Sequence, residues 1–514
     1  MKAYVRAVVL LTAILAAPSG RADAADPLLT RVRSWRAAHE AEILREFREL
    51  LSIPNLASDE PNIRRNADAI VALFARRSIP ARLLESPGAP PVVFASLPAP
   101  GARHTVIFYA HYDGQPVDPA RWTGKPWGPV LRDGPVESGG RDVPWPLPAA
   151  SVDPKFFLYA RSASDDKAPI VGLLAALDAL RAAGVKPTVN VKFFFEGEEE
   201  AGSPHLGQIL RDHAALLGGD LWLFCDGPVH QSGRKLVFFG SRGITGVELT
   251  AYGAVRRLHS GHYGNWSPNP ALELARLVAS MRDDEGNILI PGFSDDVRPS
   301  TDAELRAVAE APNVDETLRR ELRLARTEGS GKRIEERILL PALNVRGLSA
   351  GDVGDRATNS IPTEASASID FRLVPDQTPE NVRAKVEEHL RRQGWFLVRS
   401  APDDATRLAH PRLLRVEWES GYPSSRISMD LPVSRAVVKV LSDATGAAVV
   451  RLPTLGGSIP NYLFADILKT PVVGVPIANH DNNQHAANEN LRIQNLWDGI
   501  EMFAALMTGL GSGW

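Results

Sequence analysis

The sequence predicts an α/β fold in which a mixed, mostly parallel sheet is flanked by helices. Two observations support this prediction. Short, nearly continuous apolar runs are typical of strands that are buried on both faces, and such runs span residues 105–110, 189–195, 221–225 and 471–475. Helical stretches lie between the runs, for example residues 170–183, and Gly184 follows that stretch as a C-terminal cap.

Polar motifs follow these predicted strands. Side chains at the carboxyl ends of parallel strands face the crevice in which open α/β sheets bind their ligands. The motifs together supply two histidines and several carboxylates, which suit a pair of divalent metal ions bridged by a shared carboxylate. They occupy residues 110–113, 164–167, 196–203, 225–227 and 484–486.

Each motif alone has an ordinary structural explanation. A single Asp or His at the end of a strand is commonly a cap or a turn residue, and Glu198-Glu199-Glu200 alone would be a solvated run of charge. Five such motifs at one edge of a predicted sheet do not fit that explanation. We therefore interpret the set as a site for metal-assisted hydrolysis.

The order of the motifs resembles a known family. The chain reads His-x-Asp, Asp-Asp-Lys, Glu-Gly-x-Glu-Glu-x-Gly-Ser, Asp and His-x-x-Asn-Glu. This order is similar to that of the dinuclear zinc peptidases, which include carnosine dipeptidases, glutamate carboxypeptidase, and the acetylornithine and succinyl-diaminopimelate deacylases. The resemblance runs from about Glu42 to the C-terminus. Further local matches are residues 258–261, 361–362, 370–375 and 456–460.

The resemblance implies two divalent metal ions per subunit, expected to be zinc, with manganese and cobalt as alternatives that accept similar ligands. Among the implied ligands, Asp165 bridges the two ions. One site is completed by His111 and Asp226, and the other by Glu200 and His485. The five implied ligands are therefore His111, Asp165, Glu200, Asp226 and His485. In relatives the peptide bond between Asp165 and Asp166 is cis.

The resemblance also implies catalytic roles for two further carboxylates. Glu199 is the implied general base, because a carboxylate beside a metal-activated water can take its proton. Asp113, two residues after His111, is expected to fix the orientation of that imidazole ring.

The residue type at position 226, here Asp226, indicates the class of substrate. In the family this position is Asp in dipeptidase-like and aminoacylase-like members and tends to be Glu in deacylases and glutamate carboxypeptidases. The chain is therefore most similar to the dipeptidase branch, and we expect it to cleave the amide bond of dipeptides or related small peptides. An N-acyl amino acid amidohydrolase and a glutamate-type carboxypeptidase remain alternatives.

A second domain is predicted within the first. Residues 246–252 and 365–373 alternate between apolar and polar side chains, which is typical of half-exposed antiparallel strands. We expect an α+β lid domain at residues 244–423, inserted into a catalytic domain formed by residues 25–243 and 424–514. Relatives dimerise through such a lid, so the resemblance implies a homodimer.

Residues in or near the lid are expected to bind the substrate. The resemblance implies that His259 reaches the substrate carbonyl in the partner subunit and that Arg372 binds the substrate carboxylate, for which the planar guanidinium is suited. Arg372 could equally be an outward residue of a surface strand. Asn359 and Ser458 are weaker candidates for contacts to the same end of the substrate.

The chain departs from the family pattern in two places. Relatives carry glycines around the bridging aspartate, whereas this chain has Ala160-Arg161-Ser162-Ala163-Ser164 before it and Ala168 after the lysine. Glycine permits backbone conformations that alanine and serine disfavour. Residues 134–154, rich in Gly and Pro, are predicted to form a loop.

Composition is ordinary for a globular protein. The 514 residues are 44% hydrophobic and 23% charged, with a formal net charge of −3 and no basic patch that would indicate a nucleic-acid partner. Cys225 is the single cysteine, which excludes an intrachain disulfide.

The N-terminus resembles a signal peptide. Lys2 and Arg6 precede the apolar residues 7–17, and Ala22-Asp23-Ala24 offers a cleavage site after residue 24. We therefore predict export of the protein to the periplasm or out of the cell. A membrane anchor is the alternative, but the apolar stretch is shorter than the roughly 20 residues that span a bilayer.

Two other classes of function fit the sequence less well. Residues 347–351 match the Gly-x-Ser-x-Gly elbow of serine hydrolases, but that elbow needs a helix after it and Asp352-Val353-Gly354-Asp355 starts a helix poorly. A non-catalytic binding protein of the same fold would not need to retain Glu199 together with all five metal ligands.

Overall fold

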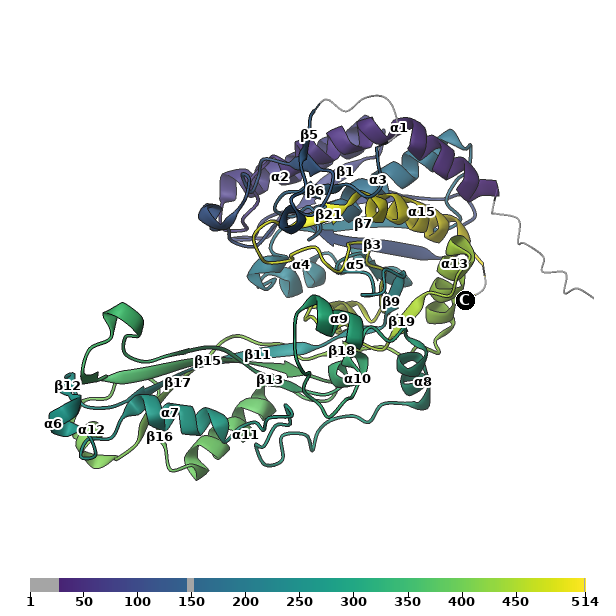
Figure 1. Ribbon diagram of the computed structural model, residues 1–514. Coiled ribbons are helices and arrows are strands. Elements are labelled where there is room, and N and C mark those ends of the chain that lie inside the picture. Colours follow the sequence, from purple (N-terminus) through teal and green to yellow (C-terminus); the bar gives the residue numbers. More distant parts are fainter. Residues whose placement is uncertain (1–26, 146–151, 513) are drawn as a thin grey trace, which may run out of the picture.

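The computed structural model describes residues 27–145, 152–512 and 514, and these residues form two parts that are each built on a sheet of their own (Figure 1). The larger part contains an eight-stranded sheet in the order β1-β2-β7-β3-β8-β20-β9-β19. Its strands are β1 (Ala81–Leu84), β2 (Val92–Leu97), β7 (Asn190–Glu196), β3 (Thr105–His111), β8 (Leu221–Phe224), β20 (Val472–Gly474), β9 (Leu236–Phe238) and β19 (Val450–Leu452).

The eight-stranded sheet is mixed. The central strands β7, β3, β8 and β20 run parallel to one another, as do β9 and β19, whereas β1–β2, β2–β7 and β20–β9 are antiparallel pairs. The predicted α/β fold with a mixed sheet is confirmed. The register pairs His111 with Glu196 and Tyr109 with Phe224, so β3, β7 and β8 end at the same edge of the sheet.

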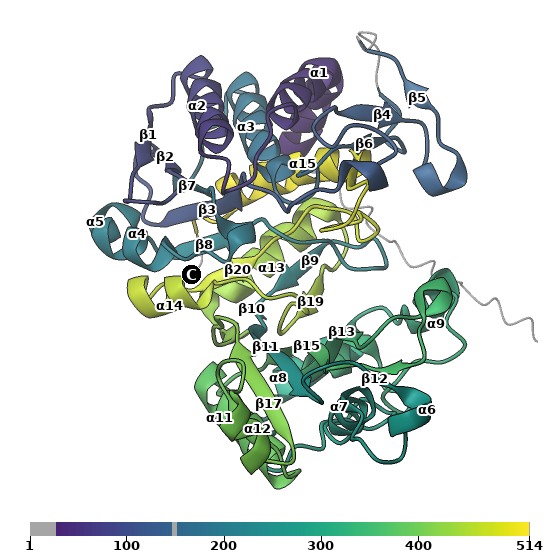
Figure 2. The ribbon, with the colours of Figure 1, turned by 90° about the vertical axis from the view of Figure 1, so that its left-hand side faces the viewer.

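Helices cover both faces of this sheet (Figure 2). Successive residues of a strand point to opposite faces, so Val106 and Phe108 of β3 join one apolar cluster and Ile107 and Tyr109 join another. The first cluster also contains side chains of α1 (Pro27–Leu51), α2 (Glu60–Arg76), α3 (Lys167–Ala182), α13 (Pro432–Thr445) and α15 (Ile493–Gly509). The second also involves α4 (Leu206–Asp212), α5 (Ala214–Leu217) and α14 (Tyr462–Leu468).

A small sheet lies beside α1, in the order β21-β6-β4-β5. Its strands are β21 (Asn490–Arg492), β6 (Phe157–Tyr159), β4 (Val130–Arg132) and β5 (Asp142–Val143). The prediction that residues 134–154 form a loop is wrong in part, because β5 pairs there with β4. A two-residue strand within a segment rich in Gly and Pro leaves no periodic signal in the sequence.

The smaller part contains a five-stranded sheet in the order β13-β15-β11-β17-β16. Its apolar face packs against α7 (Pro270–Ala279) and α11 (Pro379–Arg392), with Leu274, Val382 and Ile369 among the residues of the shared core. The strands are β13 (Ala342–Ser349), β15 (Glu364–Leu373), β11 (Gly243–Tyr252), β17 (Leu413–Trp418) and β16 (Phe396–Val398).

Two short strands, β10 (Gly240–Ser241) and β18 (Ser425–Arg426), pair where the chain passes between the two parts. Another short pair, β12 (Leu258–His259) and β14 (Ser360–Ile361), is accompanied by α6 (Ser260–Tyr263). The remaining helices are α8 (Asp302–Glu310), α9 (Asp315–Glu321), α10 (Ile334–Ile338), α12 (Asp404–Ala409), and the 3₁₀ helices η1 (Pro119–Arg121), η2 (Val136–Ser138), η3 (Glu199–Ala201) and η4 (Gly354–Arg356).

Two features bear on the alternatives raised by the sequence. Ser349 is the last residue of β13, and a bend and the short η4 follow it, so residues 347–351 do not form a strand-to-helix elbow. Within the residues that the structure describes, no helix has the length and apolar character needed to cross a bilayer.

Candidate metal centre

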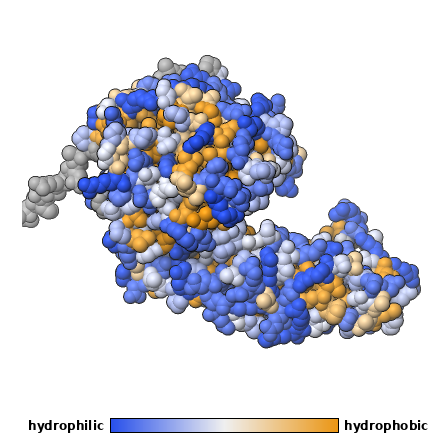
Figure 3. All heavy atoms as spheres, turned by 180° about the vertical axis from the view of Figure 1, so that it is seen from behind, coloured by the Kyte–Doolittle hydropathy of each residue, from blue (hydrophilic) through white to orange (hydrophobic). Residues whose placement is uncertain are grey.

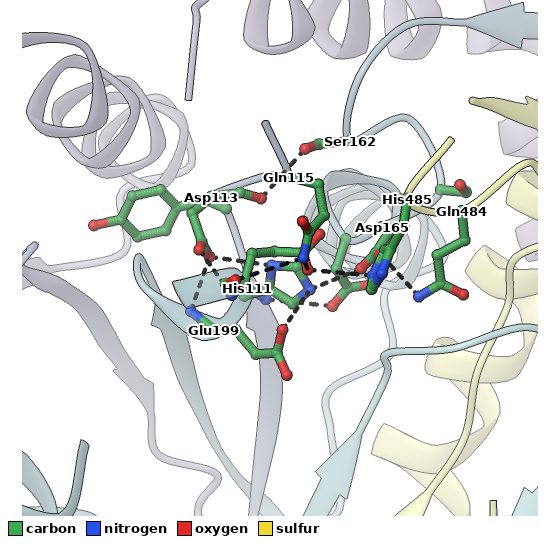
Figure 4. A network of polar contacts seen from close by, with 12 residues as sticks. His111, Asp113, Gln115, Ser162, Asp165, Glu199, Gln484 and His485 are labelled. Carbon is green, nitrogen blue, oxygen red and sulfur yellow. Dashed lines mark hydrogen bonds and ion pairs between the residues drawn. The ribbon is translucent and has the colours of Figure 1, made fainter. Parts of the chain in front are cut away.

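Asp165 lies between two histidines that are 374 positions apart in the chain (Figure 4). Its Oδ1 atom is 2.9 Å from Nε2 of His111, and its Oδ2 atom is 3.1 Å from Nε2 of His485. The carboxylate is buried, whereas the His485 side chain is 53% exposed. One carboxylate therefore faces two imidazole nitrogens through its two oxygens, which is the arrangement required of a ligand shared by two ions.

The surrounding donor atoms form two groups. In one, His111 lies with Asp166 and Asp226, and in the other Asp165 lies with Glu200 and His485, with the donor atoms of each group within 4.8 Å of one another. All five ligands predicted from the sequence are thus brought together at the carboxyl ends of β3, β7 and β8.

Asp166 was not predicted as a ligand. It is fully buried, its Oδ2 atom accepts a hydrogen bond of 3.3 Å from the main-chain N–H of His111, and its Oδ1 atom has no hydrogen-bond partner among the described residues. It follows a cis peptide bond from Asp165, as the resemblance implied. The available signal was its position in the Asp-Asp-Lys motif, but sequence alone does not show which of two adjacent carboxylates faces the histidine.

Asp113 organises the opposite side of the centre. Its Oδ1 atom is 3.2 Å from Nδ1 of His111 and also accepts a hydrogen bond of 3.1 Å from the N–H of Glu199. Its Oδ2 atom accepts a hydrogen bond of 2.9 Å from the N–H of Glu200. Asp113 therefore lies beside one imidazole ring and also holds η3, the short helix that carries two of the acidic side chains.

Glu199 points toward the same space (Figure 4). Its Oε2 atom is 4.0 Å from Nε2 of His111, and its side chain is 12% exposed. Burial raises the pKa of Glu199 well above its usual value, although the nearby His111 opposes this shift. A carboxylate with a raised pKa, close to a histidine that could bind a metal ion, suits a group that takes up a proton.

The charges of the cluster fit divalent cations. Burial raises the pKa of Asp226 to about 6 and that of Glu200 to about 7, and the adjacent Asp165 carboxylate adds to both shifts. Burial disfavours the charged form of His485, but its hydrogen bonds to Asp165 and Glu200 raise its pKa to about 11. Several buried carboxylates this close together repel one another, and cations bound among them would remove that repulsion.

The donor set also fits the metals that the sequence suggested. It consists of imidazole nitrogens and carboxylate oxygens, which bind zinc, manganese and cobalt. Two amides complete the surroundings: Gln115 donates a hydrogen bond of 2.7 Å to Oε2 of Glu200, and Gln484 donates one of 2.7 Å to Oδ2 of Asp165. Neither glutamine was predicted as a site residue, although Gln484 lies in the motif of residues 484–486.

A cavity of about 380 Å³ adjoins the acidic cluster and is lined on one side by Asp165, Glu199 and Asp226. Arg372 and Ser458 lie on its wall, and Nη1 of Arg372 donates a hydrogen bond of 2.8 Å to Oγ of Ser458. These two predicted substrate residues are therefore brought to the same cavity as the acidic cluster.

Arg242 also lies at this end of the cavity, although it was not predicted. Its Nε atom donates a hydrogen bond of 2.8 Å to the carbonyl oxygen of Gly456, which lines the cavity. Burial, and then the positive charge of Arg372, lowers the pKa of Arg242 to about 10. Two arginines thus carry positive charge beside the loop of residues 456–458.

His259 and Asn359 lie elsewhere. Both are exposed, and neither is among the described residues that line the cavity. His259 accepts a hydrogen bond of 3.1 Å from the N–H of Gly261, and the carbonyl oxygen of Asn359 accepts one of 2.8 Å from Ser260. Figure 1 places β12 and α6, which carry this region, at the end of the five-stranded sheet that is remote from the larger part.

These features define a hydrolase with a site for two metal ions at the edge of an α/β sheet. The model of Peptidase family M20/M25/M40 matches residues 107–509, so the chain belongs to that family. The resemblance found in the motifs is therefore confirmed.

Individual relatives agree with this assignment. The Cys-Gly metallodipeptidase of Schizosaccharomyces pombe is 25% identical over 496 residues, which cover 92% of this chain and 96% of that protein. The human Beta-Ala-His dipeptidase is 28% identical over 428 residues, covering 81% of this chain and 76% of that protein. The solved structure of an M20 family metallo-carboxypeptidase from Sulfolobus solfataricus is 26% identical and matches with a TM-score of 0.73 over 91% of this chain and 99% of that one.

The prediction of a metal-dependent enzyme that hydrolyses dipeptides is confirmed by these matches. The predicted export is contradicted by the comparison with the Cys-Gly metallodipeptidases of the yeasts, which align with most of this chain. The predicted signal peptide, residues 1–24, lies outside the described residues.

Proposed function

We propose that the protein cleaves the amide bond of dipeptides or related small peptides with a water activated at a two-metal centre. The observation that carries this proposal is the Asp165 carboxylate between His111 and His485, with Glu199 beside it in a cavity that also contains Arg372. In the proposed site Asp165 is the shared ligand, His111 and Asp226 bind one ion, and Glu200 and His485 bind the other.

Two bound divalent ions would lower the pKa of a water molecule and polarise the scissile carbonyl group. Glu199 accepts the proton of the attacking water at Oε2 and then delivers it to the nitrogen of the leaving amine. Asp113 holds the main chain of Glu199 by accepting its N–H, so the base is fixed in position relative to His111. We propose zinc as the native metal, because nitrogen and oxygen donors of this kind are typical of catalytic zinc.

Arg372 is proposed to bind the free carboxylate of the substrate. Its Nη1 atom points to Ser458, and its Nε atom is held at 2.8 Å from Oδ2 of Asp370, so the guanidinium plane is fixed. We expect Arg372→Met to raise KM for dipeptides by tenfold or more while leaving KM for their C-terminal amides little changed, because only the former present a carboxylate. Arg391→Met, at an exposed position of α11, is the control.

Part of the remaining wall of the cavity is apolar, with aliphatic side chains from the segment after β8, from β9, α10 and β19, and from the loop after β19. The polar residues His230, Gln231 and Glu335 belong to the same lining. Leu455 lies near Gly227, which follows Asp226, and Ile338 lies against Gly456. We propose that this wall receives an aliphatic side chain of the substrate. The aliphatic residues are Val229, Leu236, Ile334, Ile338, Leu452, Leu455 and Ile459.

The same wall would also accept the acyl chain of an N-acyl amino acid, which keeps that alternative open. A panel of substrates separates the possibilities: Leu-Gly and Gly-Leu, Asp-Gly and Gly-Asp, N-acetyl-leucine, and a peptide with C-terminal glutamate. The proposal expects the highest kcat/KM for a dipeptide that carries leucine. Preference for N-acetyl-leucine would favour the deacylase, and preference for Asp-Gly or Gly-Asp would contradict the apolar wall.

We further propose that residues 244–423 form a lid domain inserted into a catalytic domain of residues 25–243 and 424–514, and that two subunits associate through their lids. The edge strand β13 supports this, because Val345 and Leu348 are 45% and 55% exposed on it. Trp266 and Val353, both 77% exposed, belong to the same part, and apolar patches interrupt its largely hydrophilic surface in Figure 3. In such a dimer His259 would act in the active site of the partner.

A further inference from the structure

Glu489 is a fully buried carboxylate whose two oxygens both face the loop that carries Asp165. Its Oε2 atom accepts hydrogen bonds from Nη1 of Arg161 at 2.8 Å and from the N–H of Ser162 at 2.9 Å. Its Oε1 atom accepts hydrogen bonds from the N–H and the Oγ of Ser164, at 3.0 and 2.9 Å, and from the N–H of Asp165 at 3.0 Å. One side chain thus receives five hydrogen bonds from residues 161–165.

The same carboxylate joins this loop to the loop that carries His485. Glu489 lies four residues after that histidine, and its carbonyl oxygen accepts a hydrogen bond of 3.1 Å from the N–H of Ala160. Arg161, which is 2% exposed, donates a second hydrogen bond of 3.3 Å to the carbonyl oxygen of Ala486, and its guanidinium lies 5.3 Å from the ring centre of Trp122. The two loops are therefore connected through one buried ion pair.

A buried carboxylate is costly unless its partners satisfy it, and here most of the partners are main-chain N–H groups of a loop rather than of a helix or sheet. This arrangement fixes the path of the backbone at Asp165. The loop has serine and alanine where relatives have glycine, and these residues are buried, so the hydrogen bonds to Glu489 add to the packing that already holds the loop.

We propose that Glu489 is a positioning residue for the metal centre: it fixes the backbone of Asp165 so that its two oxygens face His111 and His485 simultaneously. The inference rests on the proposed two-metal site. Since Asp165 serves both ions, loss of this constraint weakens both metal sites together. Loss of a ligand that serves one ion, such as Glu200, weakens only one of the two metal sites.

Glu489→Gln tests this role, because an amide offers only one acceptor oxygen. Whichever way the amide is turned, its NH₂ group faces N–H donors of Ser162 or Ser164. We expect the affinities of both metal sites to fall by tenfold or more, as is typical when a group that orients a ligand is lost. The readout is zinc binding to the metal-stripped full-length chain, by competition with a chelator of known affinity, which is independent of activity.

Glu304→Gln is the matched control. Glu304 forms another buried ion pair, with Nε of Arg426 at 2.9 Å, and lies in α8 outside the acidic cluster. This variant should also lower Tm, but it should bind two zinc ions with wild-type affinity. A fall in zinc affinity shared by both variants would mean that general destabilisation is the cause, and it would overturn the inference.

Glu489→Asp keeps the charge opposite Arg161 but withdraws the carboxylate by one methylene, so it tests the role if the glutamine variant fails to fold. We expect it to weaken both sites by several-fold, and wild-type affinity at both sites would overturn the inference. If the wild-type chain itself does not bind two zinc ions, the proposed function fails instead, so the two failures are distinguishable.

Discussion

Asp113 accepts a hydrogen bond from the N–H of Glu199 with the same oxygen that lies 3.2 Å from Nδ1 of His111. One carboxylate thus lies against the imidazole of His111, a proposed metal ligand, and holds the main chain of the proposed base. Because Asp113 is fully buried, no solvent molecule can replace it without a change in packing.

Asp113→Asn should therefore weaken metal binding and catalysis together. The NH₂ group of asparagine cannot accept the N–H hydrogen bond that the replaced carboxylate oxygen accepts. The amide also no longer favours one tautomer of His111. We expect metal affinity to fall by about 10- to 100-fold. Isothermal titration with zinc measures this, and unchanged affinity would show that the His111 ring is fixed by other contacts.

Adjacent glutamates should give opposite results. Glu199→Gln should retain both metal ions but lose activity by about a hundredfold or more, which is the scale of a lost general base. Glu200→Gln should lose one ion. Metal content and kcat of the two purified variants decide the matter, and the reverse result would shift the assignment of base and ligand by one residue.

Glu198→Gln provides the control for that comparison. Glu198 accepts hydrogen bonds from the main chain and side chain of His205, at 2.8 and 2.9 Å, so its carboxylate is directed away from the cluster. This variant should keep both ions and most of the activity.

The metal-free protein should lose stability as pH rises from about 5 to 8. The pKa values of Asp226 and Glu200, about 6 and 7, are raised above their unfolded values, so the folded state binds more protons in this range and stability falls with pH. The pKa of His485 is also raised, to about 11. At pH values above the unfolded pKa of this histidine the folded state therefore binds more protons, and stability again falls as pH rises. Asp165 does not oppose this fall in stability, because its lowered pKa leaves it ionised at every pH between 5 and 8.

Zinc should remove this pH dependence, because binding requires the deprotonated forms of these ligands. The gain in Tm on adding zinc should therefore increase between pH 5 and 8. Thermal melting with and without zinc measures it. A gain in Tm that is constant across the range would contradict the assignment of Glu200 and Asp226 as ligands.

The proposed lid-to-lid dimer predicts complementation between inactive variants. In a hybrid dimer of a His259→Ala chain with a Glu199→Gln chain, one of the two sites has both residues intact. That site combines Glu199 of the first chain with His259 of the second, so activity should return on mixing and re-assembly. Each variant re-assembled with itself is the control. No recovery in verified hybrids would exclude the shared site, and a monomeric protein would remove its premise.

The acidic cluster could be predicted from sequence because strand ends carry strong signals. The apolar runs before His111 and Asp226 predict parallel strands, and parallel strands bring their carboxyl ends to one edge. Once that edge is known, the polar residues that follow each run must lie close together. The position of His485 follows less directly, because it lies eleven residues after β20, and its assignment depended on the family motif.

The contacts that organise the cluster could not be predicted in this way. Glu489 and Asp165 are 324 positions apart, and their hydrogen bond depends on how two irregular loops pack. Gln484 adjoins His485 in the sequence, but neither its hydrogen bond to Asp165 nor the position of the buried Arg242 guanidinium follows from a sequence pattern. Sequence patterns thus located the groups proposed to carry the chemistry, whereas the groups that hold them in place became visible only in three dimensions.

The most direct test of the central claim is the hydrolysis of Leu-Gly by the protein after its metals have been removed and then restored, with metal content measured at each stage. The account predicts two ions per chain in the active protein, loss of at least 99% of the activity on exhaustive chelation, at the hundredfold scale of a lost catalytic group, and recovery when about two equivalents of zinc are added. Full activity with metal content near zero would contradict it.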